Sequence, residues 1–343
     1  MTSAGARYAH LFAMTDGLGL FEHALFTNPR PEHGYCVDDI ARGLVVLGRE
    51  ESFGSAEAVG RRAQLAWLYL AFVRQAQQAD GRILNRREVG GAWRGAAGVG
   101  DSWGRALWGL GTAQSRGRDP ELASRAATGF RLSATLRSPW PHAMAFAGLG
   151  AAEVLRVDSG DRVARALLTD AARVVVGTGA DHPAWPWPHP RLTYANAVIP
   201  DVLMAAGDAL DDGRLVEHGL TLLEWLLEIE SRPGHLSVTP AGGWAPGEPR
   251  PGFDQQPIEV STLTDACARA YELTGSARWS RGVELGLAWF QGANDSGSAL
   301  LDDVSGGCCD GLQYHGRNEN QGAESTLALI STLQHAHRLQ PVR

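Results

Sequence analysis

Apolar residues recur along most of the chain at the three- and four-residue spacing that is typical of amphipathic helices. In one kind of segment, arginine or acidic residues follow one face of the predicted helix, and these segments lie at 57–77, 121–137, 162–177, 214–230 and 277–292. A further segment of this kind, 5–14, precedes them. Such helices are expected to place their apolar face against a core and their charged face in water.

A second kind of segment alternates with the first. These segments are rich in Ala, Gly and Leu, and each begins in a polar loop marked by Gly, Pro or aromatic residues, at 33–48, 100–113, 138–155, 192–210, 254–275 and 318–337. A helix that is apolar on most sides is expected to be buried. The alternation predicts an all-α (α/α)6 barrel of six helical hairpins, built as a single domain from residues 1–343, with short loop strands such as 235–240 and 298–307.

An open helical solenoid is the alternative architecture. It would have shorter and more uniform repeats, with a polar cap at each end. In this chain the loops are long and unequal, and the polar ones all precede the buried helices. A closed ring brings such loops together at one rim, and proteins usually carry functional groups on loops that a rigid scaffold holds. The closed ring is therefore favoured.

Composition excludes several classes of function. The net charge of -7 and the pI of about 5.9 leave no basic surface for nucleic acid or an anionic membrane. All 31 basic residues are Arg, which excludes Schiff-base lysine chemistry and a Walker lysine. The chain contains no apolar run of the roughly 18 residues that span a membrane and no signal-peptide pattern. The four cysteines form no CxxC motif, so we expect a cytoplasmic protein with reduced thiols.

The starts of the buried helices carry aromatic, amide and carboxylate side chains. They are His33, Tyr35, Asp38, Asp39, Asp101, Trp103, Arg105, Trp140, His142, Trp187, His189, Tyr194, Asn196, Asp254, Gln255, Gln256, Glu259, Asn318, Glu319, Gln321 and Glu324. Sugars present apolar C–H faces that stack on aromatic rings, and hydroxyl groups that pair with amides and carboxylates. These residues therefore predict a site for a mono- or oligosaccharide.

Each of these residues also has a structural interpretation. Asp38, Asp101 and Asp254 fit helix N-caps or first-turn acids that the helix dipole favours. Trp103 fits the core, and Glu324 fits contacts with backbone amides in the loop that contains it. However, a helix start needs only one or two capping side chains, and folding does not require so many polar and aromatic residues at the starts of all six helices. Their recurrence therefore favours a functional role over a structural one.

Glycoside hydrolysis is the sharpest hypothesis for the reaction. It needs two carboxyl groups across the scissile bond, one protonated acid and one base or nucleophile. The candidates for these roles are Asp38, Asp101, Asp254 and Glu319. Of the adjacent pair Asp38 and Asp39, only one is expected to face the cavity, and Asp39 is expected to pair with Arg42 or with a neighbouring loop. Glu259 and Glu324 are further possible partners, and spacing alone does not choose among them.

Other chemistries find less support in the sequence. His23, His33, Cys36 and Asp38 match no metal-ligand pattern, so no metal is expected. The run CCDG at 308–311 predicts a tight turn. A GxSxG nucleophile elbow is absent, and no glycine-rich run lies between a strand and a helix as a phosphate loop does. No cofactor is therefore expected.

The motifs GYCVDDIARGL, GDSWGRALWGL, LTYANAVIP, FDQQPIEV and NENQGAEST resemble, in this order along nearly the whole chain, a poorly characterised bacterial family of predicted glycosidases. Its members are often named beside, or as, glycosyltransferases. The family is similar in turn to (α/α)6 toroid enzymes, among them glucoamylase-type hydrolases and N-acylglucosamine 2-epimerases. The resemblance implies a toroid fold and a sugar ligand. The chain departs from the family pattern at His189 and Ala195, where relatives commonly carry acids.

Three functions follow as hypotheses. The first is an inverting glycoside hydrolase-like enzyme, with Asp101 as acid or base and Asp38 or Asp254 as its partner. The second is a sugar epimerase or isomerase, in which a histidine moves the proton, drawn from His33, His142, His189 and His315. The third is a glycan-binding protein without catalysis that works with a glycosyltransferase.

Overall fold

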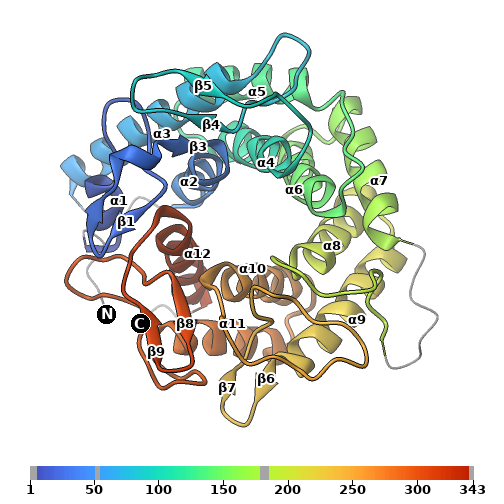
Figure 1. The fold of residues 1–343 in the computed structure, drawn as a ribbon. Helices are drawn as coiled ribbons and strands as arrows, with labels where there is room; N and C mark the ends of the chain where they lie inside the picture. The colour runs from blue at the N-terminus through green and yellow to red at the C-terminus, as the bar shows by residue number, and fades with distance from the viewer. Residues whose placement is uncertain (1–5, 51–54, 178–184, 340–343) are drawn as a thin grey trace.

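Two concentric rings of helices make up the computed structural model, which describes residues 6–50, 55–177 and 185–339 (Figure 1). Within these residues, six helices line the inner ring: α2 (Val37–Arg49), α4 (Asp101–Arg116), α6 (Pro141–Val157), α8 (Val198–Leu210), α10 (Pro257–Thr274) and α12 (Ala323–Leu339). Each inner helix contacts the next, and α12 contacts α2 and thereby closes the ring. The predicted (α/α)6 barrel is confirmed.

The outer ring consists of the amphipathic segments. Its helices are α3 (Ala56–Ala76), α5 (Pro120–Ser133), α7 (Arg162–Val176), α9 (Gly213–Ile229) and α11 (Ala277–Phe290). The sixth outer position, predicted at 5–14, holds a 3-10 turn at Ala6–Tyr8 and the short helix α1 (Ala9–Ala13), which contacts α12. The sixth hairpin is therefore closed by a much shorter outer element than the others.

Local sequence explains where the outer helices begin and which face they bury. Asp161 caps α7, because its carboxylate accepts hydrogen bonds from the backbone N–H groups of Val163 at 3.0 Å and Ala164 at 2.9 Å. Along α7 the buried residues recur at helical spacing, as at Ala164, Leu167, Leu168 and Ala171, while charged residues between them face solvent. The inner helices lack this asymmetry, and α8 is buried continuously from Val198 to Gly207.

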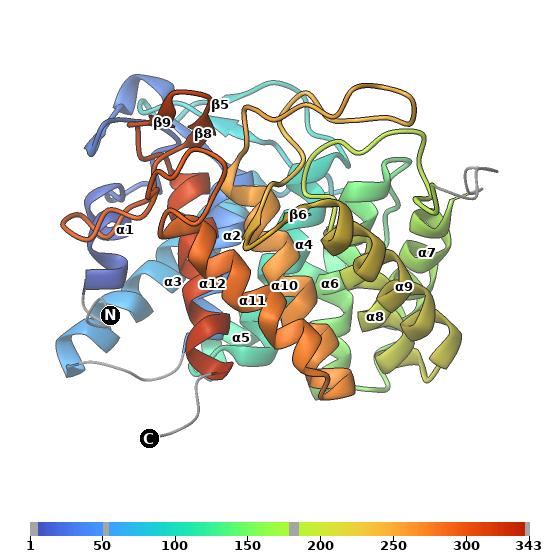
Figure 2. The ribbon, with the colours of Figure 1, turned by 90° about the horizontal axis from the view of Figure 1, so that it is seen from below.

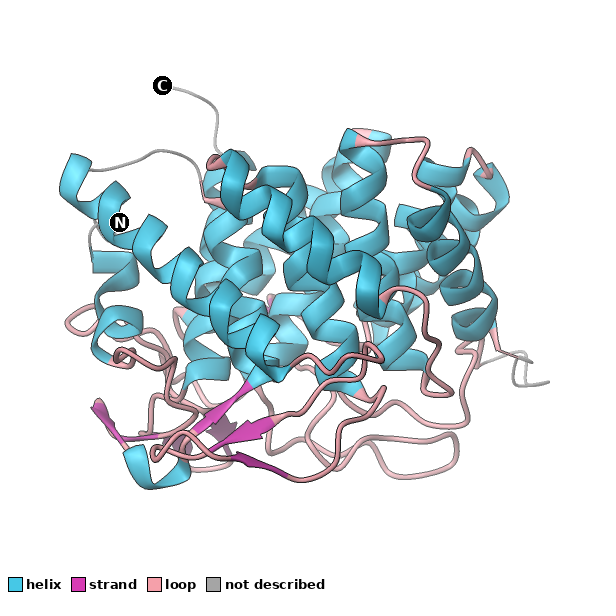
Figure 3. Cartoon of the chain, turned by 90° about the horizontal axis from the view of Figure 1, so that it is seen from above, coloured by secondary structure: helices cyan, strands magenta, loops and turns pink. Residues whose placement is uncertain are grey.

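Short antiparallel strands and long loops gather at the end of the barrel where the inner helices begin (Figures 2 and 3). The strands are β1 (Ala24–Leu25) with β2 (Asn28–Pro29), β3 (Tyr35–Cys36) with β4 (Arg86–Arg87) and β5 (Trp93–Arg94), β6 (Ser231–Arg232) with β7 (His235–Leu236), and β8 (Gly311–Gln313) with β9 (Gly316–Asn318). A 3-10 turn, Pro31–His33, precedes β3. Of the two predicted loop strands, 235–240 contains β7 and 298–307 contains one residue of the isolated bridge between Leu301 and Cys308.

Glycines allow α4 and α6 to pack with their backbones in close approach. A Cβ atom added at Gly111 would lie 2.2 Å from the Gly150 carbonyl oxygen, and one added at Gly150 would lie 2.2 Å from the Leu107 carbonyl oxygen. Protein interiors are too densely packed to absorb such overlaps without moving the helices apart. The Ala/Gly-rich composition of the inner helices is thus a condition for closing a small ring.

We expect Gly150→Ala to lower the free energy of unfolding by about 2 kcal/mol, because overpacking of a close contact outweighs the better helix propensity of alanine. Gly60→Ala is the matched control. Gly60 lies exposed within α3 with no atom within 4 Å of an added Cβ, so this change should stabilise the protein by up to about 1 kcal/mol. Urea denaturation of both variants measures the difference, and equal effects of the two changes would contradict the packing argument.

A buried polar network joins the inner helices where α12 meets α2. The Arg49 Nη1 atom donates to Asp265 Oδ1 at 3.1 Å, and Ser331 Oγ donates to the same oxygen at 2.8 Å. His335 Nε2 lies 2.8 Å from that oxygen as well. These residues come from α2, α10 and α12, so the network ties the last inner helix to the first.

In the described part of the chain, no helix is long and apolar enough to cross a membrane.

Candidate functional site

A cavity of about 330 Å³ opens at the N-terminal ends of the inner helices, and we call it the mouth cavity. Its chemistry comes from Glu22, His23, Cys36, Asp38, Asp39, Arg42, Arg86, Arg105, Gln256, Asp310 and Glu324. Of these residues, Asp38 and Asp39 lie in the first turn of α2, and Glu324 lies in the first turn of α12. Helix N-termini carry partial positive charge, so carboxylates are stabilised there.

Asp38 is held as an anion by neighbours on both of its oxygens. Arg105 Nη1 donates to Oδ1 at 2.8 Å, and Asn85 Nδ2 donates to Oδ2 at 2.7 Å. Burial favours the neutral acid, but the guanidinium groups of Arg105 and Arg42 outweigh burial and hold the pKa of Asp38 below its ordinary value. With both oxygens engaged, Asp38 fits the role of orienting Arg105 better than that of a proton donor.

Arg42 joins two carboxylates that line the mouth cavity. It donates to Asp39 Oδ1 and to Glu324 Oε2, each at 2.6 Å. The predicted pairing of Asp39 with Arg42 is thereby confirmed. The expectation that only one of Asp38 and Asp39 faces the cavity is wrong, because both line it. Residues adjacent on a helix point about 100° apart, which still lets both reach a cavity at the end of the helix.

Asp310 is a cavity residue that the sequence analysis missed. The run at 308–311 is not a tight turn, since Cys308 forms a bridge with Leu301 and Gly311 begins β8. The Asp310 carboxyl accepts a hydrogen bond from the Gly322 N–H at 2.7 Å, directly before α12. Burial raises the pKa of Asp310 to about 6; the charge of Glu324 adds to this rise, and hydrogen bonds from Gly322 and Ser325 oppose it. The sequence did contain a signal for Asp310, namely an acidic residue in the long loop before a buried helix.

A second polar group lies beside the mouth cavity on α4, α6 and the loop before α8. The Tyr194 hydroxyl donates to Asp101, whose carboxylate lies 3.9 Å from Arg105 Nη1. The ring of His142 stacks on Tyr194 with 4.6 Å between centroids. Arg105 thus connects the mouth cavity to this second polar group, since it pairs with Asp38 and its guanidinium lies 5.9 Å from the Tyr194 ring centroid.

Two histidines in this group have a nitrogen without a partner. Among the described residues, no hydrogen-bond partner reaches the buried Nε2 atoms of His142 and His189. Burial lowers the pKa of both imidazoles, that of His142 to about 4. The charge of His189 also disfavours protonation of His142. Both rings are therefore neutral at pH 7.

The predicted aromatic platforms divide into two sets. Trp103 and Trp187 are fully buried, with the Trp103 indole donating to the Ser133 carbonyl at 3.2 Å and the Trp187 ring stacked on Trp225. Neither offers a face to a sugar. Trp140, at the start of α6, has 62% of its surface exposed, and Tyr194 is half-buried. These two retain surface for stacking.

Several predicted site residues instead hold loops together. Gln321 contacts Asp302 at 2.8 Å and Ser305 at 2.7 Å. Gln255 accepts from the Trp289 indole at 3.2 Å. Three further predicted residues have such contacts. The Tyr35 hydroxyl donates to Asp16, the Asn196 side chain accepts from the Thr193 N–H, and the Asn318 side chain accepts from the Asn320 N–H. Their polar atoms satisfy loop backbone and neighbouring side chains.

Two of the predicted catalytic acids lie exposed on the rim. Asp254 is exposed, and Glu319 is exposed and pairs with Arg317 at 3.2 Å. His33 is also exposed and makes an edge contact with His23 at 5.0 Å between ring centroids. None of these three is among the residues that line the mouth cavity. Gln256, by contrast, lines it.

Glu259 anchors the loop that carries Tyr194. Its carboxylate accepts hydrogen bonds from the backbone of Ala195 and, at 3.3 Å, from the Asn196 N–H. Ala195 has a φ of 46°, a left-handed conformation that costs a non-glycine residue about 1 kcal/mol or more. Burial raises the pKa of Glu259 to about 8, while these N–H donors favour the anion. Glu259 is thus placed to hold the loop in a conformation that alanine alone disfavours.

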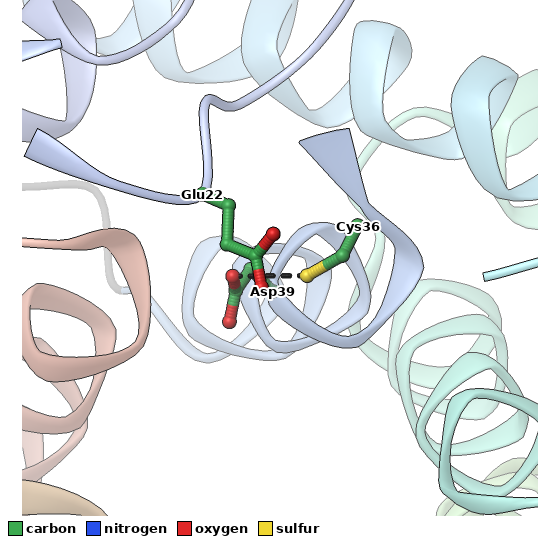
Figure 4. A group of neighbouring side chains, drawn as sticks. All are labelled: Glu22, Cys36 and Asp39. Carbon is green, nitrogen blue, oxygen red and sulfur yellow. Dashed lines mark hydrogen bonds between the residues drawn. The ribbon is translucent and has the colours of Figure 1, made fainter. Parts of the chain in front are cut away.

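Glu22, Cys36 and Asp39 bring three possible metal-ligand atoms within 4.8 Å of one another (Figure 4). Each of these residues already has a protein partner. The Cys36 thiol donates to Asp39 Oδ2 at 3.0 Å, the other Asp39 oxygen accepts from Arg42, and Glu22 pairs with Arg86. Burial raises the pKa of the Cys36 thiol well above its ordinary value, which opposes the thiolate that a metal requires. This chemistry fits a hydrogen-bonded network better than a metal site.

No known protein family matches the sequence, and no curated protein shows significant sequence similarity to it. Solved structures share the fold. A sugar epimerase from a ruminal bacterium has a TM-score of 0.72 at 12% identity, over 98% of this chain and 99% of that chain. A D-mannose isomerase has a TM-score of 0.69 at 11% identity, over 96% and 95%. A family 76 α-mannanase from Bacteroides thetaiotaomicron has a TM-score of 0.63 at 10% identity, over 96% and 94%. These likenesses establish the toroid fold.

Proposed function

We propose that this protein acts on a sugar bound in the mouth cavity and that its reaction is glycoside hydrolysis. The observation that carries the proposal is a pair of carboxyl groups, Asp310 and Glu324, which line one cavity in different environments. Asp310 is buried with a pKa raised to about 6, whereas the side chain of Glu324 is 40% exposed and pairs with Arg42. Carboxyl groups in such contrasting environments divide the roles of acid and base.

The roles follow from these environments. A general acid works best when its pKa lies near the operating pH, which Asp310 satisfies. In hydrolysis Asp310 gives its proton to the glycosidic oxygen as the bond between C1 and that oxygen breaks. Glu324 then acts on the opposite face of the sugar, either as base for the attacking water or as nucleophile. Asp38 and Asp101 hold Arg105 at the edge of the site.

Epimerisation or isomerisation of a sugar is the second candidate, and the histidine pair favours it. The Nε2 atoms of His142 and His189 have no hydrogen-bond partner among the described residues, and the free nitrogen of a neutral imidazole can accept a proton. Two of the solved structures that share the fold are named as an epimerase and an isomerase. However, a pKa of about 4 makes His142 a weak base, which favours hydrolysis over proton transfer by this histidine.

A single experiment separates these functions. The protein is incubated in D2O with a panel of mono-, di- and oligosaccharides, and the products are followed by NMR. Hydrolysis predicts new reducing ends with no deuterium at sugar carbons. Deuterium at a sugar carbon without bond cleavage would instead select epimerisation or isomerisation. Binding of a glycan with no product after long incubation would refute both and support a binding protein.

A further inference from the structure

A second cavity, of about 610 Å³, lies near the mouth cavity. It lies between the 3-10 turn Pro31–His33 and the sheet formed by β3, β4 and β5. Arg86 lines both cavities, so they are adjacent. The charged residues of the second cavity are Glu32, Arg86, Arg87, Glu88 and Arg94. We call it the arginine pocket.

Most charges in and around the arginine pocket are already paired. Arg86 pairs with Glu22, and Arg94 pairs with Glu88. Glu32 pairs with Arg30, at 2.7 Å between Nε and Oε1. Arg87 is the exception, because no ion pair joins it to a carboxylate anywhere in the described residues. The pocket therefore retains one positive charge without a protein anion.

Arg87 is nevertheless held in place by neutral groups. Its Nη1 donates to Gln75 Oε1 at 2.9 Å, and its Nε donates to the Gly91 carbonyl at 3.0 Å. The guanidinium also lies 5.7 Å from the Phe72 ring centroid and 5.4 Å from that of Trp93. A planar guanidinium fixed on aromatic rings loses little entropy when it binds a carboxylate or phosphate.

The mouth cavity has the opposite charge balance. It is lined by five carboxyl side chains, Glu22, Asp38, Asp39, Asp310 and Glu324, against three guanidinium groups, Arg42, Arg86 and Arg105. Even with Asp310 protonated as the general acid, four carboxylates face three guanidinium groups, so an anionic sugar residue is disfavoured there relative to a neutral one. The two cavities together thus favour a chain with its neutral residue at the catalytic carboxyls and its acidic group further out.

We infer that the substrate is an anionic glycan, and that Arg87 binds its carboxylate, phosphate or sulfate group in the arginine pocket while the residue to be cleaved occupies the mouth cavity. This inference rests on the proposed function, because it assumes a sugar in the mouth cavity. The anion pairs with the guanidinium that has no protein carboxylate. The exposed pairs at Arg94 and Arg86 are weak enough to exchange partners with it.

The test compares glycans that differ only in charge. Isothermal calorimetry at low salt is used with matched pairs: oligouronides and their methyl esters, sugar phosphates and the free sugars, sulfated oligosaccharides and their desulfated forms. We expect the anionic member of at least one pair to bind roughly ten- to a hundredfold more tightly, and the preference to shrink as salt is raised. The responding pair identifies whether the group is a carboxylate, a phosphate or a sulfate.

Arg87→Gln should remove this preference, so that both members of the pair bind alike. Arg94→Gln, at a side chain that is 70% exposed, should reduce the preference at little cost in stability. Arg82→Gln is the control, since Arg82 precedes the same strand but pairs with Asp80 outside the pocket. Neutral glycans that bind as well as anionic ones, or a preference that survives both pocket variants, would overturn the inference and leave the proposed hydrolysis standing. If no glycan binds at all, both the inference and the proposed hydrolysis are refuted.

Discussion

Asp310→Asn is expected to lower kcat for glycosides with poor leaving groups by about 10²- to 10⁴-fold, which is the usual contribution of a general acid. The asparagine carbonyl can still accept the hydrogen bond from the Gly322 N–H, so the start of α12 should remain in place. Glycosides with activated leaving groups need little protonation, and their turnover should fall far less. This contrast separates proton donation by Asp310 from a purely structural role.

The pH dependence of kcat/KM tests the role of Asp310 as general acid independently. Burial raises the pKa of Asp310 to about 6, so the acid loses its proton as the pH rises through that value. The wild-type kcat/KM should therefore decline above about pH 6, and this limb should be absent from Asp310→Asn. Asp303→Asn, at an exposed acid of the same loop, serves as control and should keep the wild-type profile. A full rate with poor leaving groups in Asp310→Asn would exclude it as the acid.

Asp265→Ala is expected to lower the free energy of unfolding by about 3–5 kcal/mol, because it leaves buried Arg49 without its counter-charge. The same change removes a hydrogen-bond partner of Ser331 and His335, so these two α12 side chains lose their contacts with α10. Urea denaturation followed by circular dichroism measures the effect. Glu121→Ala is the control, since it breaks an exposed pair with Arg125 and should cost less than about 1 kcal/mol.

The network should also respond to acid. Burial opposes ionisation of Asp265, but Arg49 and His335 outweigh burial and hold its pKa well below the ordinary value of a carboxyl. A lowered folded-state pKa means that the stabilisation is present above the pKa of the unfolded chain and is lost as the pH falls below it. Wild type should therefore lose stability below about pH 4 more steeply than Asp265→Ala. Parallel acid curves for the two proteins would contradict this account.

Contacts within one helix could be predicted at the site, and contacts between distant loops could not. The pair of Asp39 and Arg42 follows from their i,i+3 spacing on α2. Asp310 reaches the mouth cavity only because its loop folds back to the start of α12, where Gly322 binds it. Likewise, the orientation of Trp103 towards Ser133 depends on the packing of α4 against α5. An indole at a helix start fits a sugar site or a core equally well until that packing is known.

The sequence by itself determined the toroid, because two kinds of helical segment alternate and helical periodicity is a local property that neighbouring residues encode. It also placed the decorated loops at one rim, since each precedes a buried helix. Only the tertiary structure decided which of those side chains face the mouth cavity. In NENQGAEST, Gln321 binds Asp302 and Ser305, while Glu324 reaches the cavity and Arg42. That division depends on burial and on partners far away in the chain, which no local pattern specifies.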